Sequence, residues 1–293
     1  MSRLLPMAPL IDSVVANRQT TDVSRATVRP VLAPDVGEHE EPATGRDLTI
    51  TTARDLLVGI EAIVFEPAGV LYDSTLWWRW LLALLARLNL TCPAEKFERR
   101  WQAEYLPAVQ TGRRELAEAF EACLAASGYA RCQIDELTAA AIVRRRELEL
   151  EVHPLPGVSA TLSRLRTAGF RLALTCDSTS PPDELGARLA RYHLEGLFEV
   201  VQCSIELGCT KPNLLAFRAI QQRLELAAER LLFVGCRAGD LAGAAACGWS
   251  TLMVGPGNAP GPWPRPHAHL PRLADLVREL CPARLAAGVG TSS

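Results

Sequence analysis

Short runs of apolar residues, each ending in a loop signal, punctuate most of the chain. The run IEAIVF at 60–65 is partly β-branched and is followed at once by Pro67 and Gly69, which predicts a buried strand ending in a loop. Similar runs predict strands at 171–176, 231–234 and 251–254, with a weaker one at 198–203. The chain therefore carries at least four buried strands.

Amphipathic stretches separate these runs. Val158, Leu162 and Leu165 recur on one helical face before Gly169, and Pro212 is predicted to open a further helix. Alternation of strands with helices indicates an α/β fold with a doubly wound parallel sheet. Ligands of such sheets lie beyond the carboxyl ends of the strands, so the residues that follow each run are the ones to inspect.

The stretch between the first two strands is different because it is helical throughout. We expect a core at 56–74 and 154–285, a helical insertion at 75–153, a flexible extension at 1–55 and a flexible tail at 286–293. Three tryptophans and several leucines in the insertion predict its own core; a self-association face, giving a homodimer through this module, is the alternative. The aromatic residues are Trp77, Trp78 and Trp80.

Composition narrows the classes of partner. The chain has 293 residues, 48% of them hydrophobic and 22% charged, with a formal net charge of -2, which argues against nucleic acid and membrane surfaces. Nine scattered cysteines without a Cys-x-x-Cys spacing predict reduced thiols in a cytoplasmic protein. The N-terminal stretch does not have the continuous apolar run of a secretory signal, and 76–90 is too short and too charged to span a membrane.

Four segments at predicted strand ends carry a resemblance. They are VFEPAGVLYDS at 64–74, LALTCDS at 172–178, Lys211-Pro212-Asn213 with Phe217, and FVGCRAGDLAGAAACG at 233–248. In this order, with a helical insertion after the first, they resemble the four motifs of the haloacid dehalogenase superfamily. The similarity is greatest to its helical-cap branch, which contains phosphoglycolate phosphatase and β-phosphoglucomutase. The resemblance implies a haloacid dehalogenase-like Rossmannoid core with an inserted α-helical cap domain.

The same resemblance implies a damaged phosphatase site. The family's nucleophilic aspartate corresponds to Glu66, its acid/base aspartate to Ala68, and its first acid of the fourth motif to Cys236. The phosphate-binding residues correspond to Thr175 and Lys211. The implied cofactor is magnesium, but a thiol is a poor ligand for this hard cation, so we expect weak binding at best.

The implied metal ligands are Glu66, the Ala68 carbonyl and Cys236, with Asp240 as a weak ligand through water. Each has a simpler explanation as well. Glu66 is expected to pair with Lys211 without doing chemistry, Cys236 to be a packed small residue, and Asp240 to stabilise the first turn of a helix. Asp73 and Ser74 are expected to cap the first cap helix.

Three functional hypotheses follow. The leading one is a hydrolase-family pseudo-phosphatase that binds phosphate or a small phosphorylated molecule. The second is an active hydrolase with Glu66 as nucleophile, aided by Asp177 or Asp240, and the third is an interaction protein that uses the apolar cap. Ala68-Gly69 is also similar to phosphonoacetaldehyde hydrolases, which use a cap lysine, but Lys96 lies in an ordinary-looking helix.

Overall fold

The protein contains a six-stranded sheet in which all neighbouring strands are parallel. The computed structural model describes residues 52–88, 92–256 and 263–279. In spatial order the strands are β3 (Val200–Cys203), β2 (Arg171–Cys176), β1 (Ala62–Phe65), β4 (Leu231–Gly235), β5 (Ser250–Val254) and β6 (Ala268–Leu270). The expected α/β fold with a parallel sheet is confirmed, and β6 is a strand that the sequence pattern did not predict.

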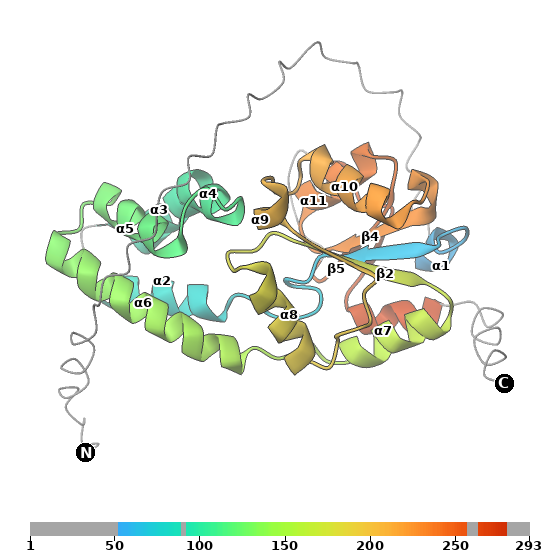
Figure 1. Ribbon diagram of the computed structural model, residues 1–293, viewed down its shortest axis with the longest axis horizontal. Coiled ribbons are helices and arrows are strands. Elements are labelled where there is room, and N and C mark those ends of the chain that lie inside the picture. Colours follow the sequence, from blue (N-terminus) through green and yellow to red (C-terminus); the bar gives the residue numbers. More distant parts are fainter. Residues whose placement is uncertain (1–51, 89–91, 257–262, 280–293) are drawn as a thin grey trace, which may run out of the picture. The chain divides into compact units, whose positions relative to one another are not determined.

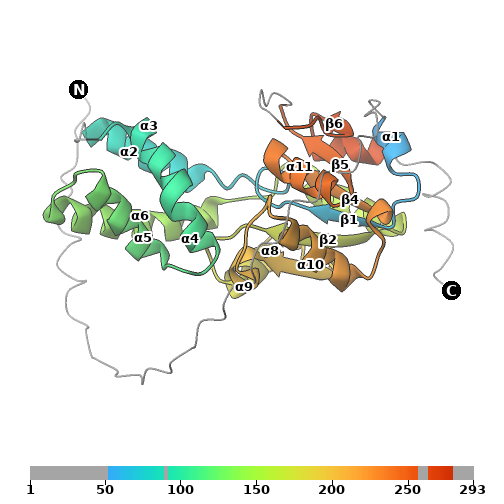
Figure 2. The same ribbon diagram turned by 90° about the horizontal axis from the view of Figure 1, so that it is seen from above.

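Helices cover both faces of the sheet because its strands are apolar on both sides. Ile63 and Phe65 of β1 face a core shared with α7 (Val158–Thr167) and α8 (Pro182–Arg191). Ala62 and Val64 face the opposite core. That core contains residues of α10 (Leu214–Leu224) and α11 (Ala238–Ala246). Figures 1 and 2 show these two helical layers with the strands between them.

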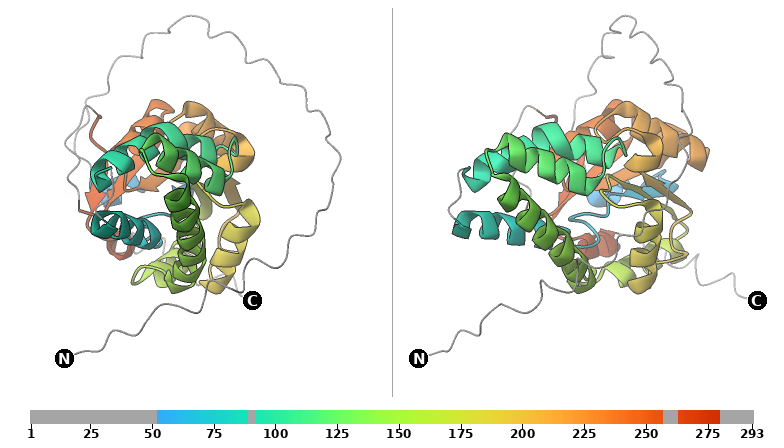
Figure 3. Two further views of the ribbon diagram at one scale, coloured as in Figure 1. Left: turned by 90° about the vertical axis from the view of Figure 1, so that its left-hand side faces the viewer. Right: turned by 60° about the vertical axis from the view of Figure 1, so that its left-hand side comes forward.

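The insertion between β1 and β2 is helical, as expected. Its elements are α2 (Leu76–Leu88), α3 (Ala94–Arg100), the π-helical turn η1 (Trp101–Tyr105), α4 (Leu106–Gln110), α5 (Leu116–Ala126) and α6 (Arg131–Glu151). They enclose an apolar cluster of their own, against which Trp77, Trp78 and Trp80 pack while partly buried. Figure 3 shows these helices grouped together. The tryptophans are thus largely used in packing within the insertion.

The start of α10 differs from the prediction. The helix begins at Leu214, because the side chain of Asn213 accepts a hydrogen bond from the backbone N–H of Leu215 and so caps the first turn. Pro212, predicted to open this helix, lies in the preceding turn after a cis peptide bond with Lys211.

Short elements complete the described chain. They are α1 (Ala53–Leu56), α9 (Ser204–Leu207) and the 3₁₀ turns η2 (Ala228–Arg230) and η3 (Leu273–Glu279). Helix α1 begins within the last three residues of the predicted flexible extension at 1–55, and its Ala53 is buried in the core, so these residues belong to the folded part. The rest of that extension, and the predicted tail at 286–293, lie outside the described residues.

The loop after β1 turns sharply back toward β4. Gly69 has a φ of 76°, and a Cβ atom at this position would lie 2.8 Å from the sulfur of Cys236. A side chain here would be both strained and in collision, so glycine is required. Asp73 accepts hydrogen bonds from the backbone and hydroxyl of Thr75. It therefore orders the residue immediately before α2.

Candidate active site

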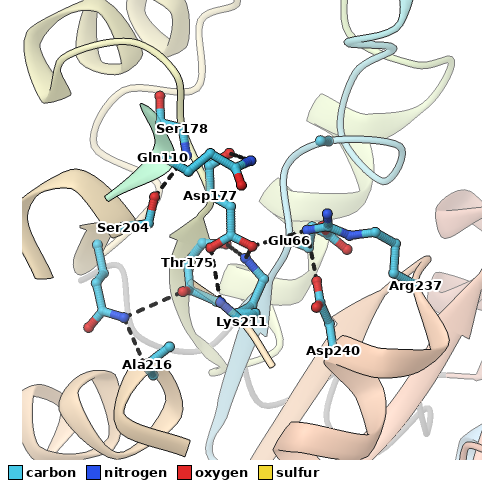
Figure 4. Close-up of polar contacts among 12 residues, drawn as sticks. Glu66, Gln110, Thr175, Asp177, Ser178, Ser204, Lys211, Ala216, Arg237 and Asp240 are labelled. Atoms are coloured by element: carbon cyan, nitrogen blue, oxygen red, sulfur yellow. Dashed lines mark hydrogen bonds and ion pairs between the residues drawn. The ribbon is translucent and has the colours of Figure 1, made fainter. Parts of the chain in front are cut away.

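The carboxyl ends of three neighbouring strands, together with the turn before α10, bring the candidate residues together. In the parallel register Phe65 is paired with Leu174 on β2 and with Val234 on β4. The next residue of each strand, or the loop directly after it, therefore lies at the same edge of the sheet. The side chains at this edge, drawn with their contacts in Figure 4, include Glu66, Thr175, Asp177, Lys211, Arg237 and Asp240.

Lys211 is buried, and its ammonium group is paired. Its Nζ lies 3.0 Å from a carboxylate oxygen of Asp177 and donates to the backbone carbonyl of Thr175 at 3.3 Å. The exposed fractions of the Lys211 and Asp177 side chains are 0% and 5%. Burial by itself lowers the pKa of Lys211, but the neighbouring carboxylates, chiefly Asp177, outweigh it and the pKa is raised. Lys211 is therefore a charged, paired lysine.

Thr175 points its hydroxyl toward Gln202, whose side-chain amide donates to it at 3.4 Å. The side chain is buried. Among the described residues, neither Thr175 nor Lys211 lines the cavity reported below. Their phosphate-binding role stays a prediction that rests on the resemblance.

Glu66 pairs with a different cation from the expected one. Its carboxylate lies 2.5 Å from Nη2 of Arg237, and it also lies 3.4 Å from the backbone nitrogen of Cys236. The side chain is 2% exposed. The expected pairing of Glu66 with Lys211 is wrong, because Asp177, directly after β2, binds the ammonium and Glu66 pairs with Arg237 instead.

Arg237 is the residue that the sequence analysis missed. Its Nη2 lies 2.5 Å from Glu66, 2.8 Å from Asp240 and 3.2 Å from Asp177, so one guanidinium joins three carboxylates (Figure 4). The position of Arg237 in the sequence could have indicated its role. It directly follows Cys236 at the end of a strand, where the loop faces the site. The resemblance of this segment to the family motif concerns acidic positions and gives the basic residue between them no role.

Asp240 lies in the first turn of α11 and is almost fully buried. Burial raises the pKa of its carboxyl group to about 7, although Arg237 and Lys211 lower it. Asp240 therefore changes its protonation state near neutral pH. Burial, followed by the charge of Glu66, raises the pKa of the Cys236 thiol to about 12, so this thiol is protonated.

The residues implied for magnesium do not fit that ion. The Cys236 thiol contacts the Ala68 carbonyl at 3.4 Å, while Glu66 and Asp240 are both bound by the guanidinium of Arg237. Magnesium requires oxygen ligands in near-octahedral geometry, and a fixed cation among them repels it. Over the part of the chain that the structure describes, no three His, Cys, Asp or Glu side chains are grouped as a metal site.

A cavity of about 480 Å³ adjoins this cluster. Glu66, Asp177 and Arg237 line its sheet side. The helical insertion contributes a larger set, of which the polar and aromatic members are Trp77, Trp78, Trp101, Gln102, Gln110, Arg145 and Glu149. The volume falls in the range of small-molecule sites.

Comparison with known proteins identifies the family. A model of the haloacid dehalogenase-like hydrolases matches residues 60–248. This chain belongs to that family. The match includes the strands that carry the cluster and the helical insertion, which in this family is the cap. The helices α2 to α6 are therefore called the cap below.

Solved structures of the family share the fold. The 2-haloacid dehalogenase of Pseudomonas syringae aligns with a TM-score of 0.53 and 20% identity, covering 78% of this chain and 99% of that one. A β-phosphoglucomutase-like protein of Thermotoga maritima aligns with a TM-score of 0.53 and 18% identity, covering 75% and 97%. At these identities the likeness concerns the fold.

Curated relatives match over a shorter segment. A glyceraldehyde 3-phosphate phosphatase of Methanothermobacter thermautotrophicus is 29% identical over 104 residues, 35% of this chain and 45% of that protein. The tyrosine-protein kinase PtkA of Mycobacterium tuberculosis is 38% identical over 102 residues, 34% of this chain and 33% of that protein. The matched segment thus spans less than half of either relative.

None of the helices in the described ranges is both long and apolar enough to cross a membrane. Eight cysteines in these ranges form no disulfide, and Cys281 lies outside the described residues.

Proposed function

We propose that this haloacid dehalogenase-like protein binds phosphate or a small phosphorylated molecule in its cap-covered cavity, with catalysis lost or severely weakened. The observation that carries the proposal is the guanidinium of Arg237, which joins the carboxylates of Glu66, Asp177 and Asp240. A side-chain cation here engages the carboxylates that the family uses for attack and for metal binding.

Attack by Glu66 is disfavoured for two reasons. One carboxylate oxygen forms an ion pair with Arg237, and the other faces the backbone nitrogen of Cys236, so neither is left as an unengaged nucleophile. The additional methylene relative to aspartate displaces the carboxylate by about 1 Å, and a misplacement of this size can cost about a hundredfold in rate.

Proton transfer to the leaving group is also impaired. Ala68 has no ionisable group at the family's acid/base position, a role that is typically worth about 10²- to 10⁴-fold. The thiol of Cys236 does not replace it, since its pKa of about 12 makes it a weak acid near neutrality.

The net charge of the carboxylate cluster is compatible with the binding of an anion. Arg237 and Lys211 balance two of the three carboxylates, and the third, Asp240, has a pKa of about 7. The cluster is therefore close to neutral, while the Arg237 side chain is 52% exposed and lines the cavity. A guanidinium offers planar N–H donors that suit phosphate oxygens. The relative named glyceraldehyde 3-phosphate phosphatase supports a phosphorylated ligand.

Thermal unfolding with phosphate esters tests the binding half of the proposal. The full chain is heated with inorganic phosphate or with glyceraldehyde 3-phosphate, and we expect the Tm to rise. A ligand at a hundred times its Kd adds about 2.7 kcal/mol, or about 5–10 °C for a domain of this size. If neither compound raises the Tm, and Arg237→Gln and Lys211→Ala leave this result unchanged, the binding proposal is wrong.

Phosphate release from the same esters, with magnesium present, tests the catalytic half. We expect release at the level of the protein-free blank for both the natural chain and Glu66→Gln. Magnesium-dependent turnover that Glu66→Gln abolishes would establish the second hypothesis, an active hydrolase with Glu66 as the nucleophile.

The metal site has its own test. Magnesium at millimolar concentration is expected to leave the Tm of the natural chain unchanged, because Arg237 already binds the carboxylates. The double substitution Cys236→Asp with Arg237→Ser removes this cation and adds an oxygen ligand, so we expect a magnesium-dependent rise in Tm. An equal rise in the natural chain would show that the guanidinium does not exclude the metal.

A further inference from the structure

Arg145, in the last cap helix α6, reaches from the cap to the loop after β2. Its Nη2 donates to the hydroxyl of Thr179 at 3.0 Å and to that of Ser180 at 2.8 Å, with a longer contact to the Thr179 carbonyl. All three acceptors lie on this one loop, and Arg145, Thr179 and Ser180 all line the cavity. A guanidinium and two hydroxyl groups thus meet at the cap side of the pocket.

This guanidinium has no carboxylate partner within 4.0 Å among the residues in the described ranges, in contrast to its neighbours. Arg144, one residue earlier, pairs with Glu147 and Glu151. Arg188, which also lines the cavity, lies 2.5 Å from Glu149. Arg145 alone of these three has only neutral partners, and all of its hydrogen bonds to described residues run through Nη2.

A cation in this position is not at its energetic optimum. Burial lowers the pKa of Arg145, and the charges of Glu184 and Glu149 only partly compensate. Neutral hydroxyl groups replace little of the hydration that a guanidinium loses, so an oxyanion in the cavity would gain a strong, charge-assisted interaction. The N–H groups on Nε and Nη1 form no hydrogen bond to another described residue and remain as charged donors for such a contact.

Tryptophan rings provide the adjoining wall. The guanidinium of Arg145 lies 5.9 Å from the ring centroid of Trp77. The indole N–H of Trp77 donates to Ala141 at 2.9 Å and that of Trp78 to Glu98 at 2.8 Å, so both polar edges are satisfied within the cap. What these residues offer the cavity is apolar ring surface, which suits a short apolar or aromatic ligand body.

We infer that Arg145, with the hydroxyl groups of Thr179 and Ser180, forms an oxyanion subsite for the carboxylate of the ligand. The ligand class is a small phosphorylated molecule with a carboxylate at the end opposite its phosphate, joined by a short apolar or aromatic body that packs on Trp77. The phosphate end rests on the proposed function and lies at Arg237. The carboxylate subsite on the cap does not depend on the proposed function.

Calorimetric titration with three probes tests this inference on the full chain. The probes are phenyl phosphate, benzoate and 4-carboxyphenyl phosphate, which carries both charged groups. We expect 4-carboxyphenyl phosphate to bind at least about tenfold more tightly than phenyl phosphate, or about 1.4 kcal/mol. In Arg145→Met this advantage should fall to within about twofold. Arg145→Lys keeps the charge but loses the planar set of N–H donors, so it should retain part of the advantage.

Arg144→Met is the matched control, because it removes the same type of side chain from the preceding position of the same helix and should keep the full advantage. An advantage that persists in Arg145→Met, or that is absent from the natural chain, overturns the inference. Equal weakening of phenyl phosphate and 4-carboxyphenyl phosphate by Arg145→Met would also overturn it, since that result shows only a tether between cap and core.

The benzoate titration separates this inference from the proposed function. If phenyl phosphate fails to bind while benzoate binds and Arg145→Met abolishes its binding, the phosphate proposal is wrong and the carboxylate subsite stands. If phenyl phosphate binds and the binding of neither carboxylate probe depends on Arg145, the carboxylate subsite is wrong and the phosphate proposal stands. Circular dichroism of each variant shows that it is folded, and Arg145→Lys provides the measurement should Arg145→Met unfold.

Discussion

Replacing Arg237 by methionine tests the idea that this guanidinium compensates a buried cluster of carboxylates. The substitution keeps much of the apolar stem but leaves Glu66, Asp177 and Asp240 with Lys211 as the only cation bound within the cluster of Figure 4. Breaking a buried ion pair typically costs about 3–5 kcal/mol, whereas an exposed pair contributes about 0–1 kcal/mol. The cost should lie between these limits.

The exposed fractions of the four side chains determine where the cost of Arg237→Met falls between these limits. The Arg237 side chain is 52% exposed, while those of Glu66, Asp177 and Asp240 are 2%, 5% and 6% exposed. Screening by solvent discounts the upper limit, so we expect a loss of about 2 kcal/mol in the free energy of unfolding at pH 8. For a domain of this size, that loss corresponds to a fall in Tm of about 4–8 °C.

The loss should depend on pH because the pKa of Asp240 is raised to about 7. A raised carboxyl pKa means that the native state binds a proton more tightly than the unfolded chain, so stability falls as pH rises through the interval from about 4 to 7. Without Arg237 the pKa of Asp240 rises further. At pH 5 the carboxyl group is neutral in both proteins, and the destabilisation by Arg237→Met should be smaller than at pH 8.

Urea unfolding at pH 5 and pH 8 measures both effects, with Arg230→Met as the matched control. The Arg230 side chain is 55% exposed, close to the value for Arg237, but its carboxylate partner Glu61 is 42% exposed. Its loss should cost about 0–1 kcal/mol at either pH. The reasoning fails if Arg237→Met is no more destabilising than Arg230→Met at pH 8, or if its cost is the same at both pH values.

Two further predictions concern packing and thiol chemistry. Gly243→Ala should destabilise the protein by about 1–3 kcal/mol in urea unfolding, because the new Cβ would lie 2.6 Å from a backbone oxygen of Pro212. Gly239→Ala in the same helix has its nearest contact at 3.5 Å and should be neutral or slightly stabilising, so equal effects would contradict this account. Cys236, with a thiol pKa of about 12, should be alkylated by iodoacetamide at pH 8 more slowly than the exposed Cys132. Peptide mapping by mass spectrometry measures the two rates, and faster modification of Cys236 would show that its thiol is not suppressed by burial.

The strands and the order of the candidate segments were readable in the sequence because they depend on local patterns. Apolar runs that end in loop residues mark β1, β2, β4 and β5, and a long helical stretch between the first two marks the insertion. The three-residue strand β6 was missed because AHL is too short and too polar at its centre to show periodicity. Its partner β5 defines it through backbone hydrogen bonding.

The chemical state of the site was decided by tertiary structure. The sequence shows that the nucleophile position holds Glu66, that the acid/base position holds Ala68, and that only one lysine lies at a strand-end segment. It does not show which charges pair, since Glu66, Asp177 and Arg237 come from three different strand ends whose distances depend on the sheet order. Short-range Coulomb interactions depend on those distances and on burial, which local sequence patterns do not encode. The order of the strands in the sheet therefore determines that Asp177 binds Lys211 and that Arg237 binds Glu66.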